Sequence, residues 1–257
     1  MIRIEDVEVM GIRKAIKGMR NALNSWDKSD SGFYQCGCPE VGTTYCGSYG
    51  DRCFRGNCGT CRMRSYDMGD ADMDLAKRLI KAGSSGRKFL RMIHVQADVT
   101  APLYWWKQAD QYRIGVTTNS TSTMHTIHKK EFTLDDFSHE HFWDKTNEVH
   151  GSIPGYLGKN SSDYLKDLLR YLNFIRTKFI ETKDKAYWWQ MIQLLPSSYN
   201  QMRTIDLNYE TLFSIYHQRK NHKLDEWEEF CKWIETLPYM NEFLGLDEQT
   251  ETKEQKE

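Results

Sequence analysis

Residues 98–125 read DVTAPLYWWKQADQYRIGVTTNSTSTMH. Alternating residues over 88–101 predict a strand that leads into this stretch, and Pro102 is suited to the first turn of a helix over 102–112. Helical spacing brings Lys107, Gln108 and Gln111 near one another. The loop GVTTNSTS then offers hydroxyl, amide and backbone N–H groups. Such a set is typical of a site for a phosphorylated small molecule.

Aromatic residues fill the same helix, namely Tyr104, Trp105, Trp106 and Tyr112. Core packing is the commoner use of such residues, although they can also pack against the ring system of a ligand. The pattern leaves both interpretations open.

The rest of the chain predicts an α+β protein in which helices dominate. Alternation over 1–10 indicates a strand, and an apolar face over 11–23 indicates a helix. The pattern over residues 70–83 predicts a helix that begins with acidic residues and ends at a glycine. The pattern over residues 120–132 predicts a helix with a Ser or Thr cap. Residues 135–160 are expected to form a loop. The apolar pattern over 161–196 predicts two helices, and that over 208–240 predicts two more, with a break between them near Asn221.

Composition limits the function classes. The 257 residues carry 35 Lys and Arg against 36 Asp and Glu, so no basic excess favours a nucleic-acid polymer as partner. No apolar run reaches the length of a membrane span, and the charged start MIRIEDVEVMGIRK lacks the apolar segment of a secretion signal. We expect a cytoplasmic protein without a membrane partner.

Six of the seven cysteines lie in residues 36–61. In a reducing compartment such a cluster favours a metal over disulfides, and Cys-x-x-Cys is a good two-ligand knuckle for zinc. An iron–sulfur cluster needs the same four thiolates, and free cysteines on a loop are the alternative. Full thiolate ligation predicts a structural site without an open position for chemistry. The predicted metal ligands are Cys36, Cys38, Cys58 and Cys61.

The opening stretch resembles the signature region of the flavin-dependent thymidylate synthases of the ThyX type. That family shows a strand, an Ala-Pro pair, a helix that carries Arg-Gln, and then R-H-R-x-x-S-x-N-E-x-S-x-R-Y. Ala101 and Pro102 match the pair, and Lys107-Gln108 matches Arg-Gln conservatively. Arg113 stands at the last arginine of R-H-R.

The resemblance continues beyond the helix. Asn119 and Ser122 keep the N-x-x-S spacing, with one extra residue after Arg113. Downstream, the segment LLPSSYNQMRTIDLNYETLFSIYHQRKNHKLDEW resembles the family's later helical half, with Arg203 and Arg219 near the places of two family arginines. The resemblance covers most of the chain outside the cysteine-rich segment and the tail.

Four places depart from the family's motif. The residues that stand there are Gln111 and Tyr112 for the first two of R-H-R, Ser120 for the glutamate, and Met124-His125 for the closing Arg-Tyr. In the family these positions help to hold FAD and the nucleotide, and the closing arginine is linked to activation of the uracil ring. Any altered chemistry is therefore expected at these positions.

The resemblance implies one ThyX-like domain over residues 1–246, a mixed sheet with flanking helices and a helix-rich C-terminal half. Residues 31–66 would be a cysteine-rich insertion and residues 247–257 a charged, disordered tail. It also implies a homotetramer with FAD and dUMP at subunit interfaces. Methylenetetrahydrofolate would donate one carbon, which converts dUMP to dTMP, and NADPH would reduce the flavin. Because flavin and folate carry the chemistry, no catalytic side chain is predicted.

Site residues follow from the resemblance position by position. The residues expected at the pyrimidine deoxynucleotide are Gln108, Ser120, Ser122 and Arg203. Those expected near the flavin are Gln111, Tyr112, Arg113, Asn119, His217 and Arg219. Arg203 is the expected phosphate partner, since a guanidinium binds an oxyanion with two hydrogen bonds.

Two alternatives to a thymidylate synthase remain. One is a protein of the same fold that binds a nucleotide or flavin and has lost or changed catalysis. The other is a zinc-stabilised interaction module without a small-molecule site. Flavin absorption bands in the purified protein would support the thymidylate synthase hypothesis and weigh against the interaction module.

Overall fold

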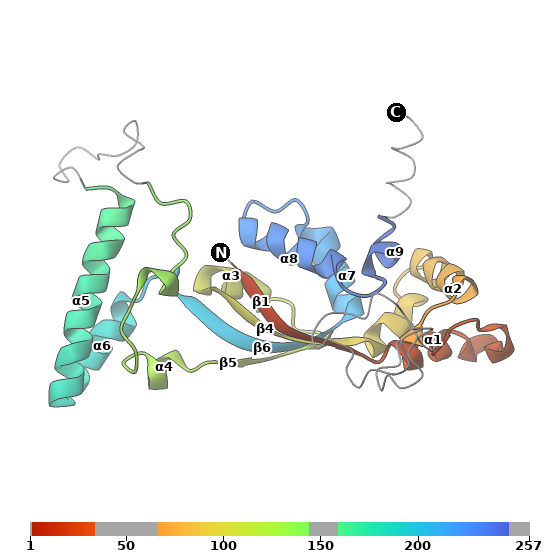
Figure 1. Ribbon diagram of the computed structural model, residues 1–257, viewed down its shortest axis with the longest axis horizontal. Coiled ribbons are helices and arrows are strands. Elements are labelled where there is room, and N and C mark those ends of the chain that lie inside the picture. Colours follow the sequence, from red (N-terminus) through yellow and green to blue (C-terminus); the bar gives the residue numbers. More distant parts are fainter. Residues whose placement is uncertain (1, 34–65, 144–158, 247–257) are drawn as a thin grey trace, which may run out of the picture. The chain divides into compact units, whose positions relative to one another are not determined.

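The computed structural model describes residues 2–33, 66–143 and 159–246 (Figure 1). The chain forms two compact units and passes between them several times. One unit holds residues 1–8, 95–207 and 214–234, and the other holds residues 9–94, 208–213 and 235–257. The prediction of a single domain over 1–246 stays a prediction.

A four-stranded sheet forms the centre of the first unit, in the order β1-β4-β6-β5. Its strands are β1 (Arg3–Met10), β4 (His94–Pro102), β5 (Val116–Ser120) and β6 (Asn200–Asn208). Strands β5 and β6 are antiparallel, with Val116 opposite Leu207. Successive side chains alternate between the faces, so Val95, Ala97 and Val99 are buried while the residues between them are polar and exposed or half-exposed. One face of the sheet is therefore apolar and the other polar.

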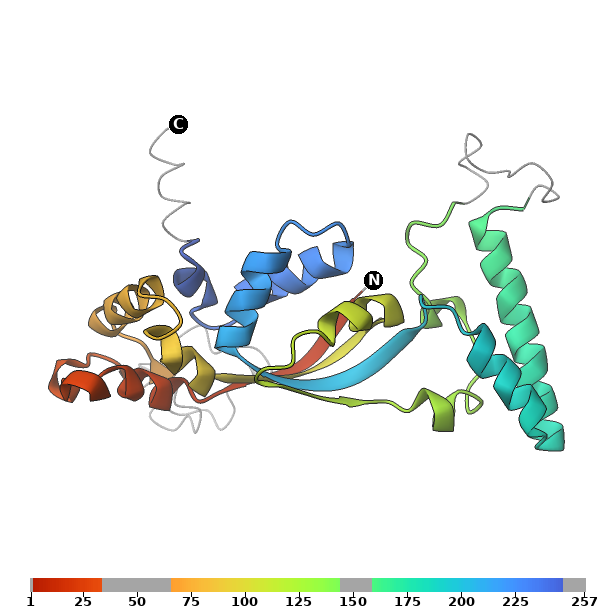
Figure 2. The same cartoon turned by 180° about the vertical axis from the view of Figure 1, so that it is seen from behind.

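Helices cover the apolar face (Figures 1 and 2). They are α3 (Leu103–Ala109), α7 (Tyr209–Arg219) and α8 (Asp225–Glu235). The ring of Trp105 on α3 packs against Trp227 and Phe230 of α8, with centroids 4.8 and 5.4 Å apart. Burying three large aromatic side chains is worth several kcal/mol, on the order of 2–3 each. The aromatic residues of α3 thus serve the core.

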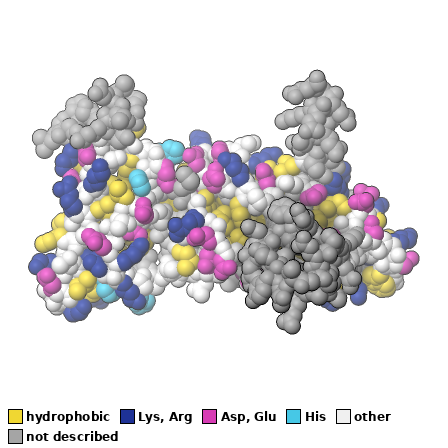
Figure 3. Space-filling view, viewed as in Figure 1, with side chains coloured by type: hydrophobic (Ala, Val, Ile, Leu, Met, Phe, Trp, Pro, Cys, Tyr) yellow, Lys and Arg dark blue, Asp and Glu magenta, His cyan; other side chains and the backbone are white. Residues whose placement is uncertain are grey.

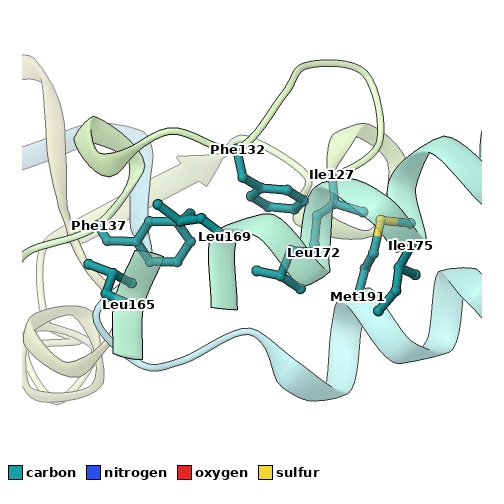
Figure 4. Packing of buried hydrophobic residues seen from close by; sticks show 8 residues of the cluster. All are labelled: Ile127, Phe132, Phe137, Leu165, Leu169, Leu172, Ile175 and Met191. Carbon is teal, nitrogen blue, oxygen red and sulfur yellow. The ribbon is translucent and has the colours of Figure 1, made fainter. Parts of the chain in front are cut away.

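A helical hairpin, α5 (Ser161–Thr182) and α6 (Lys185–Leu194), belongs to the same unit. Asn160 caps α5, and Lys183 turns the chain between the helices with φ 57°. Eight buried residues join the hairpin to the loop after α4 (Thr123–Thr126), which includes a 3₁₀ turn at Leu134–Asp136. Figure 4 shows these side chains, which are Ile127, Phe132, Phe137, Leu165, Leu169, Leu172, Ile175 and Met191.

The second unit contains the helices α1 (Ile12–Met19), α2 (Asp70–Lys81) and α9 (Met240–Leu244), and 3₁₀ turns at Asn21–Leu23, Trp26–Lys28 and Arg87–Met92. Strands β2 (Gly32–Phe33) and β3 (Tyr66–Asp67) pair antiparallel and close the base of the predicted cysteine-rich insertion. Its four predicted metal ligands lie outside the described residues.

Asp72 of α2 is fully buried and receives hydrogen bonds from Arg20, Ser29 and Ser31 at 2.5, 2.6 and 2.5 Å. A buried charge needs such partners, because an unpaired one is very costly. This network joins α2 to the end of α1 and to the segment before β2.

The predicted helices at 11–23, 70–83 and 102–112, the pair in 161–196 and the pair in 208–240 are confirmed, with shorter bounds. The structure differs from the predictions at four places. The segment GVTTNSTS contains strand β5 instead of being all loop, β6 was not predicted, and only Thr123–Thr126 of the helix expected over 120–132 is α-helical. The strand expected from 88 begins at His94, because residues 87–92 form a 3₁₀ turn.

Acidic and basic side chains are interspersed over the part of the surface that Figure 3 shows outside the grey atoms. This distribution agrees with the balanced composition. Among the described residues, no helix has the length and apolar character needed to span a membrane.

Candidate nucleotide and flavin site

Helix α3 positions the first of the predicted site residues. Its first two backbone N–H groups donate 3.0 Å hydrogen bonds to carbonyl oxygens of the segment before β6. These two N–H groups therefore have acceptors without a side-chain cap. Trp105 and Trp106 are almost fully buried against the sheet and α8. Gln108 and Lys107 follow within one turn, where Gln108 is half-buried and Lys107 is exposed.

A cavity of about 170 Å³ lies among α3, α8, β5 and β6. Its apolar lining includes Trp105, Trp106 and Trp227, and its polar lining residues are Asp110, Tyr112, Arg113 and Thr118. The indole Nε1 of Trp105 is buried and has no hydrogen-bond partner within the described residues. An unpaired buried N–H costs free energy, and an acceptor on a ligand would relieve that cost.

Three helices meet in a group that we call the arginine cluster: Gln108, Tyr112, Arg219 and Trp227. Gln108 Oε1 accepts from Trp227 Nε1 at 2.8 Å and from Arg219 Nη1 at 3.4 Å. Arg219 Nε donates to Tyr112 Oη at 2.7 Å. The guanidinium carbon also lies 4.9 Å from the Trp227 ring centre and 5.5 Å from that of Tyr112. Cation–π attraction and hydrogen bonds therefore fix this guanidinium in place.

The charge of Arg219 is not neutralised within the part of the chain that the structure describes, where no carboxylate forms an ion pair with it. The pKa of His222 is lowered by burial and then by the charges of Arg219 and Lys223. A guanidinium that lacks a carboxylate partner is a ready partner for a phosphate or another oxyanion.

Arg203, the expected phosphate partner, is already engaged. Its Nη1 lies 2.7 Å from Asp110 Oδ1, its Nε donates to Gln201 Oε1 at 3.1 Å, and its guanidinium carbon lies 4.2 Å from the Trp106 ring centre. Its side chain is 14% exposed. A phosphate would compete with Asp110 for this guanidinium.

The predicted residues on and after β5 divide between the two faces of the sheet. Thr118 lines the cavity, so alternation turns Asn119 to the opposite, polar face and Ser120 back to the cavity side. Ser120 pairs in register with Arg203. Ser122 caps α4, where its Oγ accepts from the backbone N–H of His125 at 3.3 Å.

The remaining flavin candidates lie at the edge of this region. Arg113 lines the cavity, is exposed, and donates to the Asp110 carbonyl at 3.4 Å. Gln111 is exposed and donates to the Lys107 carbonyl at 3.4 Å. His217 is exposed on α7. The structure thus brings Gln108, Tyr112 and Arg219 together and leaves these three residues more peripheral.

Met124 stands where the family's motif closes with an arginine. Its side chain is 52% exposed, and its carbonyl accepts from Trp188 Nε1 at 3.1 Å. Arg87 lies in the other unit, where it pairs with Glu210 at 2.8 Å. Arg91 is exposed in that unit.

Sequence reasoning missed a polar group beside the cavity helices. Tyr104 Oη donates to the buried Glu226 carboxylate and lies 2.9 Å from Ser138 Oγ. Burial, followed by the hydrogen bond to Glu226, raises the pKa of Tyr104 to about 12. The acidic run at the start of α8 predicts a helix terminus and gives no signal that one of its carboxylates is buried.

Metal ligation finds no support in the ranges 2–33, 66–143 and 159–246, where no group of three or more His, Cys, Asp or Glu residues is placed to hold an ion. His141 Nε2 instead lies 2.8 Å from Asp225, and His139 Nδ1 lies 2.8 Å from the Phe137 carbonyl. The zinc or iron–sulfur prediction concerns cysteines outside these ranges.

Solved structures that resemble this chain include thymidylate synthase X from Helicobacter pylori, crystallised with FAD and dUMP. Two such structures have TM-scores of 0.57 and 0.58 at 14% identity, and the matches cover 95% and 94% of this chain and 97% of the other. The UMP/dUMP methylase PolB from Streptomyces cacaoi, bound to 5-Br dUMP, has a TM-score of 0.51 at 16% identity. That match covers 92% of this chain and 89% of PolB.

No protein-family model matches the sequence, and no curated protein matches it in sequence. The likeness is thus one of structure, and at these identities it shows the fold. The chain has a ThyX-like fold of mixed helix and sheet, which confirms the predicted fold class.

Proposed function

We propose that this chain is a ThyX-like enzyme that binds FAD and a pyrimidine deoxynucleotide and transfers one carbon from methylenetetrahydrofolate to the pyrimidine. One observation carries the proposal. The resemblance assigned Gln108 to the nucleotide and Tyr112 and Arg219 to the flavin of one site region. Arg219 donates hydrogen bonds to both Gln108 and Tyr112, although more than 100 residues separate it from each of them. Solved structures of this fold that hold FAD and dUMP support the proposed binding of a flavin and a nucleotide.

The arginine cluster fits an anionic, ring-containing ligand. The Arg219 guanidinium offers N–H donors and an uncompensated charge for phosphate oxygens. Tyr112 and Trp227 offer aromatic faces, and the cavity beside them is large enough for a single ring and not for a whole dinucleotide. A bound flavin would supply the redox chemistry. In this proposal the side chains bind and orient the ligands, and the absence of a catalytic side chain stays a prediction.

The wider proposal follows the family resemblance. It includes NADPH as reductant of the flavin, a homotetramer, and a location in the cytoplasm. UMP or dUMP as the nucleotide is supported by the likeness to PolB, whose structures hold brominated forms of both.

A second function is favoured by Arg203 and Met124. The expected phosphate arginine is paired with Asp110, and the residue at the end of the motif carries no charge. These two features favour a protein that binds nucleotide or flavin and has lost or changed the methylation step.

Binding and turnover distinguish the two functions. We expect the purified chain to take up FAD, measured by quenching of flavin fluorescence, and to bind dUMP in calorimetry. Arg219→Gln should weaken the binding of at least one of them by about tenfold or more, since a charge-assisted hydrogen bond is lost. Arg170→Gln is the matched control, because Arg170 is exposed on α5 and pairs only locally with Asp167.

Release of tritium from [5-³H]dUMP with methylenetetrahydrofolate and NADPH would establish the methyl transfer. Binding without release would favour the second function. Failure of the wild-type chain to bind either FAD or dUMP would reject both.

A further inference from the structure

A second cavity, of about 250 Å³, lies in the first unit beside the helical hairpin. The residues that line it are Thr126, Ile127, Lys129, Lys130, Phe132 and Tyr199. None of them belongs to the arginine cluster, to the first cavity or to the predicted site. The cavity therefore needs an explanation of its own.

The loop that forms this cavity is firmly held. Asn173 of α5 accepts from the Phe132 N–H at 2.8 Å and donates to the Phe132 carbonyl at 2.9 Å. Asp136 closes the next turn by accepting from Thr133 N at 2.9 Å. Because these contacts fix the backbone that follows Lys130, the cavity is largely pre-formed, as ligand sites usually are.

One wall of the cavity is apolar. Ile127 and Phe132 are 3% and 5% exposed and belong to the core of the hairpin. Figure 4 shows Phe132 beside Ile127 in the core of the hairpin. The rings of Phe132 and Phe137 have centroids 6.4 Å apart. The Tyr199 ring packs on Phe137 with centroids 5.6 Å apart. An aromatic or branched apolar group would therefore find contact surface here.

The polar part of the lining is cationic. Lys130 pairs with the buried Asp136, so its charge is balanced. Lys129 is exposed and forms no ion pair with any residue in the described ranges. Among the described residues that line the cavity, one uncompensated ammonium group remains.

Tyr199 adds a neutral donor. Its hydroxyl forms no hydrogen bond to any described residue, although the side chain is half-buried. Burial raises the pKa of Tyr199, and the negative charge of Asp136 raises it further, so the phenol keeps its proton at neutral pH. The Thr126 hydroxyl already donates to the Ser122 carbonyl at 2.5 Å and can only accept.

We propose that this cavity binds a small carboxylate with an aromatic or branched apolar body. The carboxylate oxygens accept from the Lys129 ammonium group and the Tyr199 hydroxyl, and the apolar body lies against Ile127 and Phe132. A single negative charge is favoured over the two of a phosphate monoester, because one cation is free among the described lining residues and Asp136 lies nearby. This site is independent of the proposed nucleotide site.

Benzoate is the test probe, titrated into the full chain by calorimetry with and without FAD and dUMP. We expect saturable binding in both conditions. Lys129→Gln should raise the Kd of benzoate about tenfold, and Tyr199→Phe should raise it several-fold, through the loss of one charge-assisted hydrogen bond each. Lys166→Gln, which removes an exposed charge from α5, is the matched control and should leave the Kd unchanged.

Benzamide, which has the same shape without the charge, should bind at least tenfold more weakly than benzoate, by about the same margin as loss of the Lys129 contact. Four outcomes would each overturn the proposal: no benzoate binding at millimolar concentration, equal binding of benzamide, an unchanged Kd in both Lys129→Gln and Tyr199→Phe, or an equal effect of Lys166→Gln. Thermal unfolding of each variant shows whether it is folded.

Discussion

Arg219 and Trp227 share one hydrogen-bond acceptor, Gln108 Oε1, while the guanidinium carbon of the arginine lies 4.9 Å from the centre of the indole ring. The three residues come from α7, α8 and α3. The Gln108 side-chain oxygen therefore links the three helices through hydrogen bonds. It also helps to orient the Arg219 guanidinium, which has no carboxylate partner among the described residues. A binding group held in this way needs little reorganisation when a ligand arrives.

Replacing Gln108 by leucine should lower the free energy of unfolding by about 1–3 kcal/mol, because the buried Trp227 N–H loses its acceptor. Urea unfolding at pH 7 measures the change. Gln111→Leu is the control from the adjoining turn, where the side chain is exposed and bonded only to a nearby carbonyl. That variant should stay within about 0.5 kcal/mol of the wild type. Equal effects of the two substitutions would contradict a structural function of Gln108.

Asp72 should make stability depend on pH. Burial alone would raise the pKa of its carboxyl, but the hydrogen bonds from Ser29, Ser31 and Arg20 and the charge of Arg20 together hold it below the value of 3.8 that applies when the chain is unfolded. A lowered native pKa means that the stabilisation is present above pH 3.8 and is lost as the pH falls below it towards the native pKa.

Asp72→Asn should therefore unfold more easily at pH 7, by about 3 kcal/mol, since Arg20 is left as a buried charge without a carboxylate. The variant should also lose part of the acid dependence of the wild type between pH 5 and 2. Urea unfolding across this range measures both effects. Asp74→Asn, an exposed position on the same helix, should keep the wild-type profile. A normal acid dependence in the Asp72 variant would show that other carboxylates control it.

Tyr104→Phe should destabilise the first unit by about 1.5–3 kcal/mol, because the buried Glu226 loses a hydroxyl donor. The native pKa of about 12 exceeds the unfolded value of 10.0, so this stabilisation is complete below pH 10 and declines as the pH rises towards 12. The difference between wild type and variant should accordingly shrink between pH 10 and 12 in urea unfolding. Tyr171→Phe, exposed on α5, is the control. A difference that is constant with pH would mean that the hydroxyl group does not donate to Glu226.

Local pattern was enough to predict α3 and the helices of the C-terminal half. Pro102 fixes where α3 begins, and the apolar spacing of the later helices persists over several turns. Strand β5 escaped prediction because its sequence, VTTNS, is polar on an edge position and has only Val116 half-buried. In β6, Met202 is an apolar residue on the exposed face, which disturbs the alternation of Ile205 and Leu207. Pairing between the two strands, and not local propensity, decides both.

In the candidate site, too, some contacts could be predicted from the sequence and others could not. The contact of Tyr112 with Arg219 could be anticipated, because a family resemblance placed both residues at one site. The ion pair between Asp110 and Arg203 could not, since the two residues lie 93 positions apart and neither matches a motif that names a partner. Buried polar contacts such as Tyr104 with Glu226 depend on how helices pack, which single-sequence patterns do not specify.

Asp110 should limit nucleotide affinity if Arg203 is a phosphate partner, as the family resemblance implies. The carboxylate holds the Arg203 guanidinium at 2.7 Å and is itself 48% exposed, so the pair is partly open to solvent. Asp110→Asn would release the guanidinium and remove a negative charge from the cavity lining. The Kd of dUMP, measured by calorimetry, should fall by about two- to fivefold, the range expected for removing one competing, partly exposed ion pair.

Asp135→Asn removes an equal charge from an exposed position in the loop before α5 and should leave the Kd unchanged. Weaker dUMP binding in Asp110→Asn would instead show that the Asp110–Arg203 pair shapes the site, with Arg203 in a structural position and Arg219 as the cation left for the phosphate.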